Sequence, residues 1–184
     1  MKAFTPVYIP AGVPTFHLES AKAQFEASVK LLRGIDGRFA VPDDMLLSID
    51  ALDAFVSSVE PDLVVFQNLT FANSAYISAV LRRVKCPILL WTLREPVIDG
   101  GRLRLNSLTG AYSAANAMRA FDGRRFEYVF GAPDEERVRG AIAACTAAAE
   151  LIKNMRTLKM SAVGHTPQGF GFGRALDAEL MSVF

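Results

Sequence analysis

Two short runs of mostly apolar residues constrain the fold of this chain more than any other feature. They are DLVVFQ at residues 62–67 and PILLWTL at residues 87–93. Strands of a parallel sheet have this composition, because helices cover both of their faces. The segment between the two runs, residues 72–84, carries apolar residues at helical spacing. This strand–helix–strand order predicts a right-handed parallel crossover, and therefore an α/β fold.

The same alternation extends in both directions along the chain. Helical spacing ends at glycine or proline in several places, for example before Pro61. We expect five βα units that form a flavodoxin-like doubly wound parallel sheet over residues 1–156. The further predicted strands are residues 6–10, 38–41 and 126–130, and the further predicted helices are residues 18–32, 48–59, 106–121 and 134–155.

A sixth strand-like segment at residues 160–163 is followed by the glycine-rich stretch GHTPQGFGFG and a helix-like segment at residues 175–184. One interpretation is a sixth unit of the same sheet. We favour the first βα unit of a second, incomplete α/β domain over residues 157–184, because a single unit cannot bury its own apolar face. The stretch lacks the Lys-Ser/Thr pair of a phosphate loop and the third small residue of a dinucleotide fingerprint. It is either a plain turn or a weak contact for an anion or a sugar hydroxyl.

Composition excludes several classes of function. No apolar stretch approaches the roughly 20 residues of a membrane span, and early prolines interrupt any secretory signal, so we expect a cytoplasmic protein. The 20 Lys and Arg residues against 19 Asp and Glu give a net charge of +1, which favours neither nucleic acid nor a membrane as partner. Cys86 and Cys145 lie in apolar segments without a nearby cysteine or histidine, and we expect buried, reduced thiols.

Polar and aromatic side chains gather where the predicted strands end. In open parallel sheets ligands bind at this edge. His17 follows the first strand, Gln67 and Asn68 end the third, and Trp91 and Arg94 end the fourth. An aromatic plate with amide and guanidinium groups suits a sugar, so these five residues are the predicted substrate-binding site.

Each candidate also has a plain structural explanation. Trp91 could pack in the core, Arg94 could form a solvated pair with Glu95, and His17 could be a hydrogen-bonded surface histidine. Asn106 or Ser107 could only cap its helix.

Gly110 is unfavourable inside a helix unless packing or a close contact requires it. The two histidines, His17 and His165, have no companions at metal-ligand spacing, and no nucleophile motif is present. We therefore predict no catalytic residue and no metal ligand in this chain.

Four segments together resemble the amino-terminal region of the L-fucose and L-arabinose isomerase family. They are FHLES, VVFQNLTFANSAYISAVLRRVKCPILLWT, LNSLTGAYSAANAMRAF and KMSAVGHTPQGF, and the resemblance covers nearly all 184 residues. It implies an aldose–ketose isomerase that uses a divalent metal, commonly manganese, and forms trimers or hexamers. It places the metal ligands beyond Phe184 and gives this region substrate contacts across a subunit interface, through Trp91, Gln67 and His17.

Two functional hypotheses follow. The leading one is the amino-terminal, substrate-contacting and assembly portion of a metal-dependent aldose–ketose sugar isomerase. The alternative is a stand-alone flavodoxin-like module that binds a small sugar or anion without catalysis. Packing of residues 175–184 on the first sheet would favour the module, whereas an uncovered apolar face would favour the isomerase portion.

Overall fold

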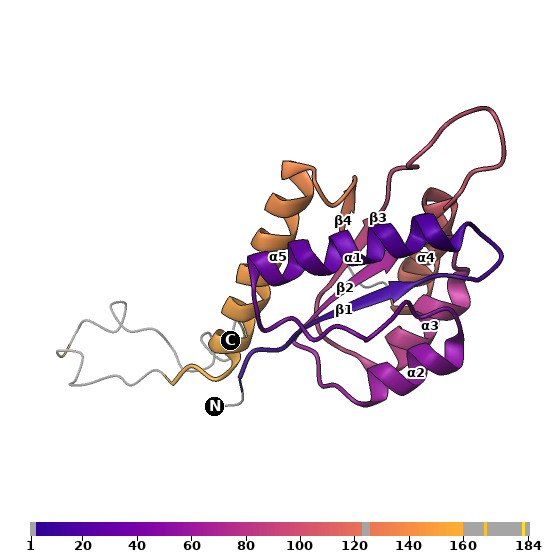
Figure 1. The fold of residues 1–184 in the computed structure, drawn as a ribbon. Coiled ribbons are helices and arrows are strands. Elements are labelled where there is room, and N and C mark those ends of the chain that lie inside the picture. Colours follow the sequence, from indigo (N-terminus) through magenta and orange to yellow (C-terminus); the bar gives the residue numbers. More distant parts are fainter. Residues whose placement is uncertain (1–2, 123–125, 160–167, 169–181, 183–184) are drawn as a thin grey trace.

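The computed structural model describes residues 3–122, 126–159, 168 and 182 of the chain. Its centre is a parallel sheet with the strand order β1-β2-β3-β4 (Figure 1). The strands are β1 (Pro6–Ala11), β2 (Leu63–Asn68), β3 (Ile88–Thr92) and β4 (Glu127–Phe130). Every residue of β1, β2 and β3 is buried, as the continuous apolar runs predict. The α/β, flavodoxin-like fold class is confirmed.

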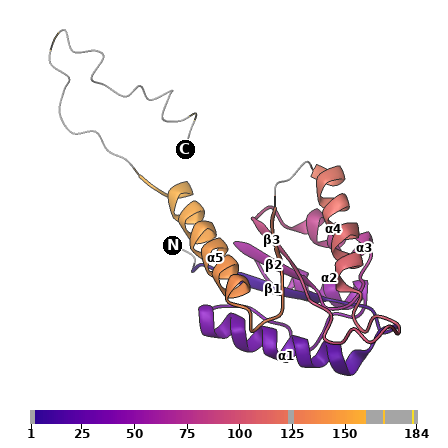
Figure 2. The ribbon, with the colours of Figure 1, turned by 90° about the horizontal axis from the view of Figure 1, so that it is seen from above.

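Helices cover both faces of the sheet (Figure 2). One face packs against α1 (Leu18–Ile35) and α5 (Glu136–Arg156), and the other against α2 (Ile49–Ser57), α3 (Ser74–Arg83) and α4 (Ser107–Asp122). Alternate residues of each strand enter different cores, so Val65 lies with α1 and α5 while Val64 lies with the other three helices.

Residues 38–41 lie beside β1 as predicted, but they do not form the predicted strand. Instead of a strand, the chain makes two isolated parallel bridges to β1, Val7 to Ala40 and Ala11 to Leu46. The amide of Tyr8 donates to the carbonyl of Ala40 at 2.9 Å, so this side of β1 pairs through every second residue. Pro10 falls on the same side and has no N–H to donate, which explains why pairing breaks between the bridges. The segment still lies outside β1, where a doubly wound flavodoxin-like sheet has its second strand.

Several expectations concern the carboxyl end of the chain and lie outside the described residues. These are the strand at residues 160–163, the glycine-rich stretch, the helix at residues 175–184 and the second domain they would begin. Within the described part, Cys86 is buried and Cys145 half-buried, and both are free thiols. No helix of that part is long and apolar enough to cross a membrane.

Candidate functional site

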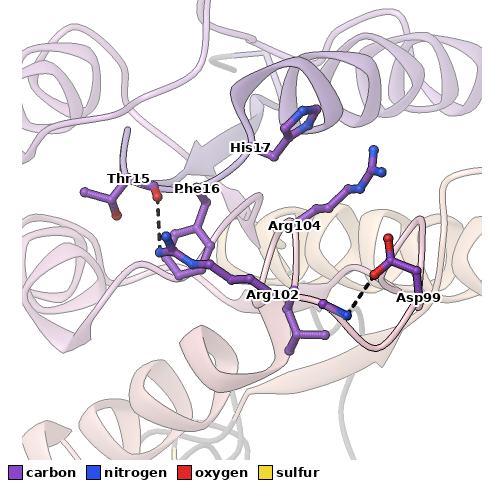
Figure 3. A pocket seen from close by; sticks show the side chains of 8 residues that line it. Thr15, Phe16, His17, Asp99, Arg102 and Arg104 are labelled. Carbon is purple, nitrogen blue, oxygen red and sulfur yellow. Dashed lines mark hydrogen bonds between the residues drawn. The ribbon is translucent and has the colours of Figure 1, made fainter.

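A cavity of about 440 Å³ lies at the carboxyl edge of the sheet, between the loop after β1 and the long segment that joins β3 to α4 (Figure 3). We call it the strand-end cavity. This edge is where parallel α/β proteins bind ligands. Its lining comes from two short stretches of chain: Thr15, Phe16 and His17 from the first, and Asp99, Gly101, Arg102, Leu103 and Arg104 from the second.

One wall of the cavity is held by an internal carboxylate. The segment from residue 102 to residue 106, here called the strap, runs into the start of α4. Glu95 accepts hydrogen bonds from the amides of Arg104 and Leu105 at 3.1 Å each, and from the amide of Asn106 at 2.5 Å. These amides precede the amino terminus of a helix, where negative charge is favourable. The Glu95 side chain therefore fixes the path of the strap.

The strap is also tied to the loops after β1 and β2. The amide of His17 donates to the carbonyl of Arg104 at 3.0 Å, and the amide of Phe71 donates to the carbonyl of Leu105 at 2.9 Å. The Leu105 side chain is fully buried beneath the strap. These contacts fix the backbone of the strap, which carries Arg102 and Arg104.

His17 begins α1 and lines the cavity. Its Nδ1 accepts a hydrogen bond from the amide of Ser20 at 3.2 Å and lies 2.8 Å from the Ser20 hydroxyl. The ring thus caps the helix with Nδ1, a role that serines and aspartates usually fill. With Nδ1 as acceptor, the neutral ring carries its proton on Nε2, which leaves an N–H donor for a ligand. The surface-histidine explanation and the cavity position both hold for this residue.

Two arginines supply the positive charge of the cavity. The Arg102 guanidinium lies 4.9 Å from the centre of the Phe16 ring and donates to the carbonyl of Thr15 at 3.2 Å. Arg104 and His17 lie on the other side of the cavity in Figure 3. Asp99 is the acidic lining residue, and one of its oxygens accepts from the amide of Gly101 at 3.0 Å. The balance of charges favours an anionic or partly anionic ligand.

Gln67 and Trp91 are neighbours in the register of β2 and β3, and both side chains are buried. Tyr8 donates a short hydrogen bond to the amide oxygen of Gln67, and the Gln67 amide nitrogen donates to Ser28 at 3.0 Å. Burial raises the pKa of the Tyr8 hydroxyl, which therefore stays protonated and donates. The Trp91 indole N–H donates to the carbonyl of Gly131 at 2.9 Å. Both residues occupy the core, and their contact with a sugar stays a prediction.

Asn68 lies on the opposite face of the sheet, beneath α4. Its amide nitrogen is 3.5 Å from the carbonyl of Ala72, and its buried amide oxygen has no protein partner within the described residues. A Cβ on Gly110 would come within 2.7 Å of the Asn68 amide nitrogen. This close approach is the packing reason for a glycine at position 110 of a helix.

Ser107, the first residue of α4, does more than cap the helix. Ser107 is buried, accepts from the amide of Leu93 at 2.9 Å and donates to the carbonyl of Asn68 at 2.5 Å. Asn106 takes the left-handed conformation with φ of 52° and accepts from the Thr109 hydroxyl at 2.7 Å. Ser107 therefore joins α4 to both central strands.

Arg94 lies apart from the strand-end cavity and pairs with Glu135, not with Glu95. Its guanidinium donates to both carboxylate oxygens, at 3.0 and 3.2 Å, and lies 4.9 Å from the centre of the Phe130 ring. The Arg94 guanidinium, the amide of Ala132 and Arg137 lower the pKa of Glu135 to about 2. The suggested Arg94–Glu95 pair is wrong, because Glu95 holds the strap.

The five predicted residues thus occupy separate places. The structure brings Gln67 and Trp91 together in the core and places only His17 in the strand-end cavity. Sequence reasoning missed Arg102 and Arg104. A signal was available, since fourteen residues separate β3 from α4 and loops of that length are usually functional.

No group of three His, Cys, Asp or Glu side chains gathers at metal-binding distance in residues 3–122 and 126–159. The described residues therefore do not fit the divalent metal that the family resemblance implies.

Comparison with known proteins gives related sequences of much greater length. No protein-family model matches the chain. It is 60% identical over 184 residues to a sulfoquinovose isomerase from Clostridium sp. (strain MSTE9), a match that covers 100% of this chain and 41% of that protein. It is 35% identical over 185 residues to a sulfoquinovose isomerase from Priestia aryabhattai, covering 99% of this chain and 41% of that protein. The chain therefore spans about two fifths of the length of these relatives. Their names point to a sugar isomerase, and neither is an L-fucose or L-arabinose isomerase.

Solved structures add little. An azoreductase from Bacillus anthracis aligns with a TM-score of 0.38 and 13% identity, covering 83% of this chain and 100% of that one. Azoreductase AzrA aligns with a TM-score of 0.35 and 15% identity, covering 80% of this chain and 98% of that one. At these scores neither carries an argument about function.

Proposed function

We propose that this chain is the amino-terminal, substrate-contacting portion of a sugar isomerase that acts on sulfoquinovose or a closely related sulfonated sugar. The observation that carries the proposal is the 60% identity that extends over all 184 residues to a protein of that name. The location of the strand-end cavity supports it, because this edge of the sheet is the usual ligand-binding edge of the fold.

The part of the reaction we assign to the described residues is substrate positioning. His17 is the predicted site residue that lines the cavity, and its Nε2–H is available to donate to a sugar hydroxyl or an anionic oxygen. Gln67 and Trp91 fix the ends of β2 and β3 from within the core. Asn68 accepts from Ser107 at the start of α4 through its backbone carbonyl, and Arg94 pairs with Glu135 at the start of α5. We assign these four residues a positioning role in place of the direct contact predicted from the sequence.

The proposal retains the aldose–ketose chemistry, the divalent metal and the homo-oligomer that the family resemblance implies. Since the described residues offer no metal site, we derive no step through a metal. The metal, manganese in the resembling family, belongs in this proposal to residues outside the described ones, and so does the proton or hydride movement between C1 and C2. A cytoplasmic location goes with this metabolic role.

The test is turnover by the polypeptide that the natural gene encodes. Sulfoquinovose, L-fucose and L-arabinose would be incubated separately with the protein and manganese, and aldose loss followed by proton NMR. We expect conversion of sulfoquinovose to a ketose at a rate well above that of the two uncharged sugars. Preference for L-fucose or L-arabinose would reject the substrate. Saturable binding of sulfoquinovose with no conversion would replace the isomerase with the stand-alone binding module.

A further inference from the structure

We infer that the strand-end cavity is the subsite for the sulfonate group of the substrate, and that Arg102 and Arg104 are the residues that bind it. This inference rests on the proposed function and adds to it the group that is recognised and the residues that recognise it. The shared chemistry is a tetrahedral anion with three or four outward oxygens, which guanidinium groups bind through paired N–H donors.

First, no carboxylate among residues 3–122 and 126–159 neutralises the charges of these two arginines. Within the described part of the chain neither forms an ion pair, whereas Arg38, Arg83, Arg94 and Arg137 each do. Arg102 uses one donor on the carbonyl of Thr15, which leaves the rest of its guanidinium free. Figure 3 shows the two guanidinium groups on opposite sides of the cavity, so each offers its own positive charge to an anion that enters.

Second, the other positive features of this edge are already occupied. Glu95 accepts from the amides at the start of α4, and Glu135 accepts from two donors of Arg94 and one of Arg137. An anion arriving at this edge of the described structure therefore finds its available partners on the strap.

Third, the backbone of the strap and the Arg102 side chain are already held in place. The Phe16 ring supports the Arg102 guanidinium from one side, and the strap is fixed by Glu95 and by the amide of His17. A site whose donors are already held loses less conformational entropy when the ligand binds.

The cavity also has room and partners for the rest of the sugar. Its volume of about 440 Å³ falls within the roughly 300–1,000 Å³ of small-molecule sites. Asp99 uses one carboxylate oxygen on the amide of Gly101, so the other can accept a sugar hydroxyl. His17 lines the same space, and because Nδ1 caps α1, its Nε2–H is the remaining donor of the neutral ring.

The test compares two sugars that differ only in the sulfo group: sulfoquinovose, and quinovose, which carries hydrogen in its place. Dissociation constants would be measured on the natural gene product and on its Arg102→Gln and Arg104→Gln variants. We expect each variant to weaken sulfoquinovose binding about tenfold or more, because each removes charge-assisted hydrogen bonds. Binding of quinovose should change less than about twofold, since it has no charge to lose. Added salt should weaken sulfoquinovose binding in the unmodified protein more than in the variants.

Arg119→Gln is the matched control. Arg119 is exposed in the last turn of α4, far along the helix from the strap, and its loss makes the same change in net charge. This variant should bind sulfoquinovose like the unmodified protein. Equal losses in all three variants would mean that only net charge matters, and would overturn the subsite.

The remaining outcomes separate this inference from the proposed function. Turnover of sulfoquinovose with unchanged affinity in both strap variants would reject the subsite and leave the function standing. Equal loss of sulfoquinovose and quinovose binding would show that the arginines do not read the sulfo group. No binding or turnover of sulfoquinovose, with inorganic sulfate bound in an arginine-dependent way, would reject the function and assign the cavity to a free anion.

Discussion

Gly110 is the position at which a single methyl group tests the packing of α4 most directly. A Cβ there would lie 2.7 Å from the amide nitrogen of Asn68 and 3.1 Å from the backbone nitrogen of Ala72. To reach ordinary contact near 3.4 Å, the buried Asn68 side chain must give way by about 0.7 Å and the backbone at Ala72 by about 0.3 Å. Such overpacking typically costs about 1–3 kcal/mol. The gain in helix propensity from Gly to Ala offsets about 1 kcal/mol of this.

We therefore expect Gly110→Ala to lower the free energy of unfolding by up to about 2 kcal/mol. For a chain of this size that corresponds to a fall in Tm of up to roughly 8 °C. Thermal unfolding would be followed by circular dichroism at 222 nm.

Gly140→Ala is the matched control for this prediction. Gly140 lies in α5, and no atom lies within 4 Å of the place that an added methyl group would take, so only the propensity gain applies. Its Tm should rise by roughly 1–4 °C, from a gain of about 0.5–1 kcal/mol. If Gly110→Ala raised Tm as Gly140→Ala does, the close approach between α4 and β2 would be refuted.

Three further predictions concern charged and reactive side chains. Glu95→Gln should loosen the strap, because a neutral amide oxygen accepts hydrogen bonds more weakly than a carboxylate. We expect faster amide hydrogen exchange at residues 104–106, and unchanged exchange would show that the strap does not need this charge. Glu135 should titrate by carbon-detected NMR with a pKa of about 2, so the stability that its pairing adds is present above pH 4.5 and is lost as the pH falls through about 2. In Arg94→Gln that midpoint should move back toward 4.5, and a native midpoint already near 4.5 would contradict the pairing. The pKa of the Cys145 thiol is raised mainly by burial and to a smaller extent by the charge of Glu127. A disulfide reagent should therefore modify Cys145 slowly at pH 8 in the folded chain and quickly in urea. Equal rates would disprove its burial.

The central strands were predictable because the sequence pattern and the burial agree there. Residues 62–67 and 87–93 form β2 and β3 within one residue at each end, since helices cover both faces and every position is apolar or inward. The outer edge next to β1 was less predictable. There the missing N–H of Pro10 breaks the pairing, an effect of the partner strand that the composition of residues 38–41 does not carry.

The site was predictable in location but not in detail. A cavity lies at the expected edge of the sheet, and His17 is the predicted residue that lines it. The pattern could not show which strand-end side chains turn inward. Gln67 and Trp91, which find their hydrogen-bond partners within the core, were therefore predicted as substrate-binding residues, with a core position as the alternative for Trp91. Arg102 and Arg104 do not follow a strand directly, since the strap returns to the edge from a long loop, and strand-end position could not indicate them.

The carboxylate of Glu95 has a consequence for how ligand preference can change in proteins built this way. Because the Glu95 carboxylate already accepts from the backbone amides of the strap, the loop needs no ligand to hold this path. Selectivity for charge then depends on two side chains that project from a self-sufficient backbone. A sequence could exchange an anionic substrate for a neutral one by changing those two positions, without rebuilding the loop or the sheet beneath it.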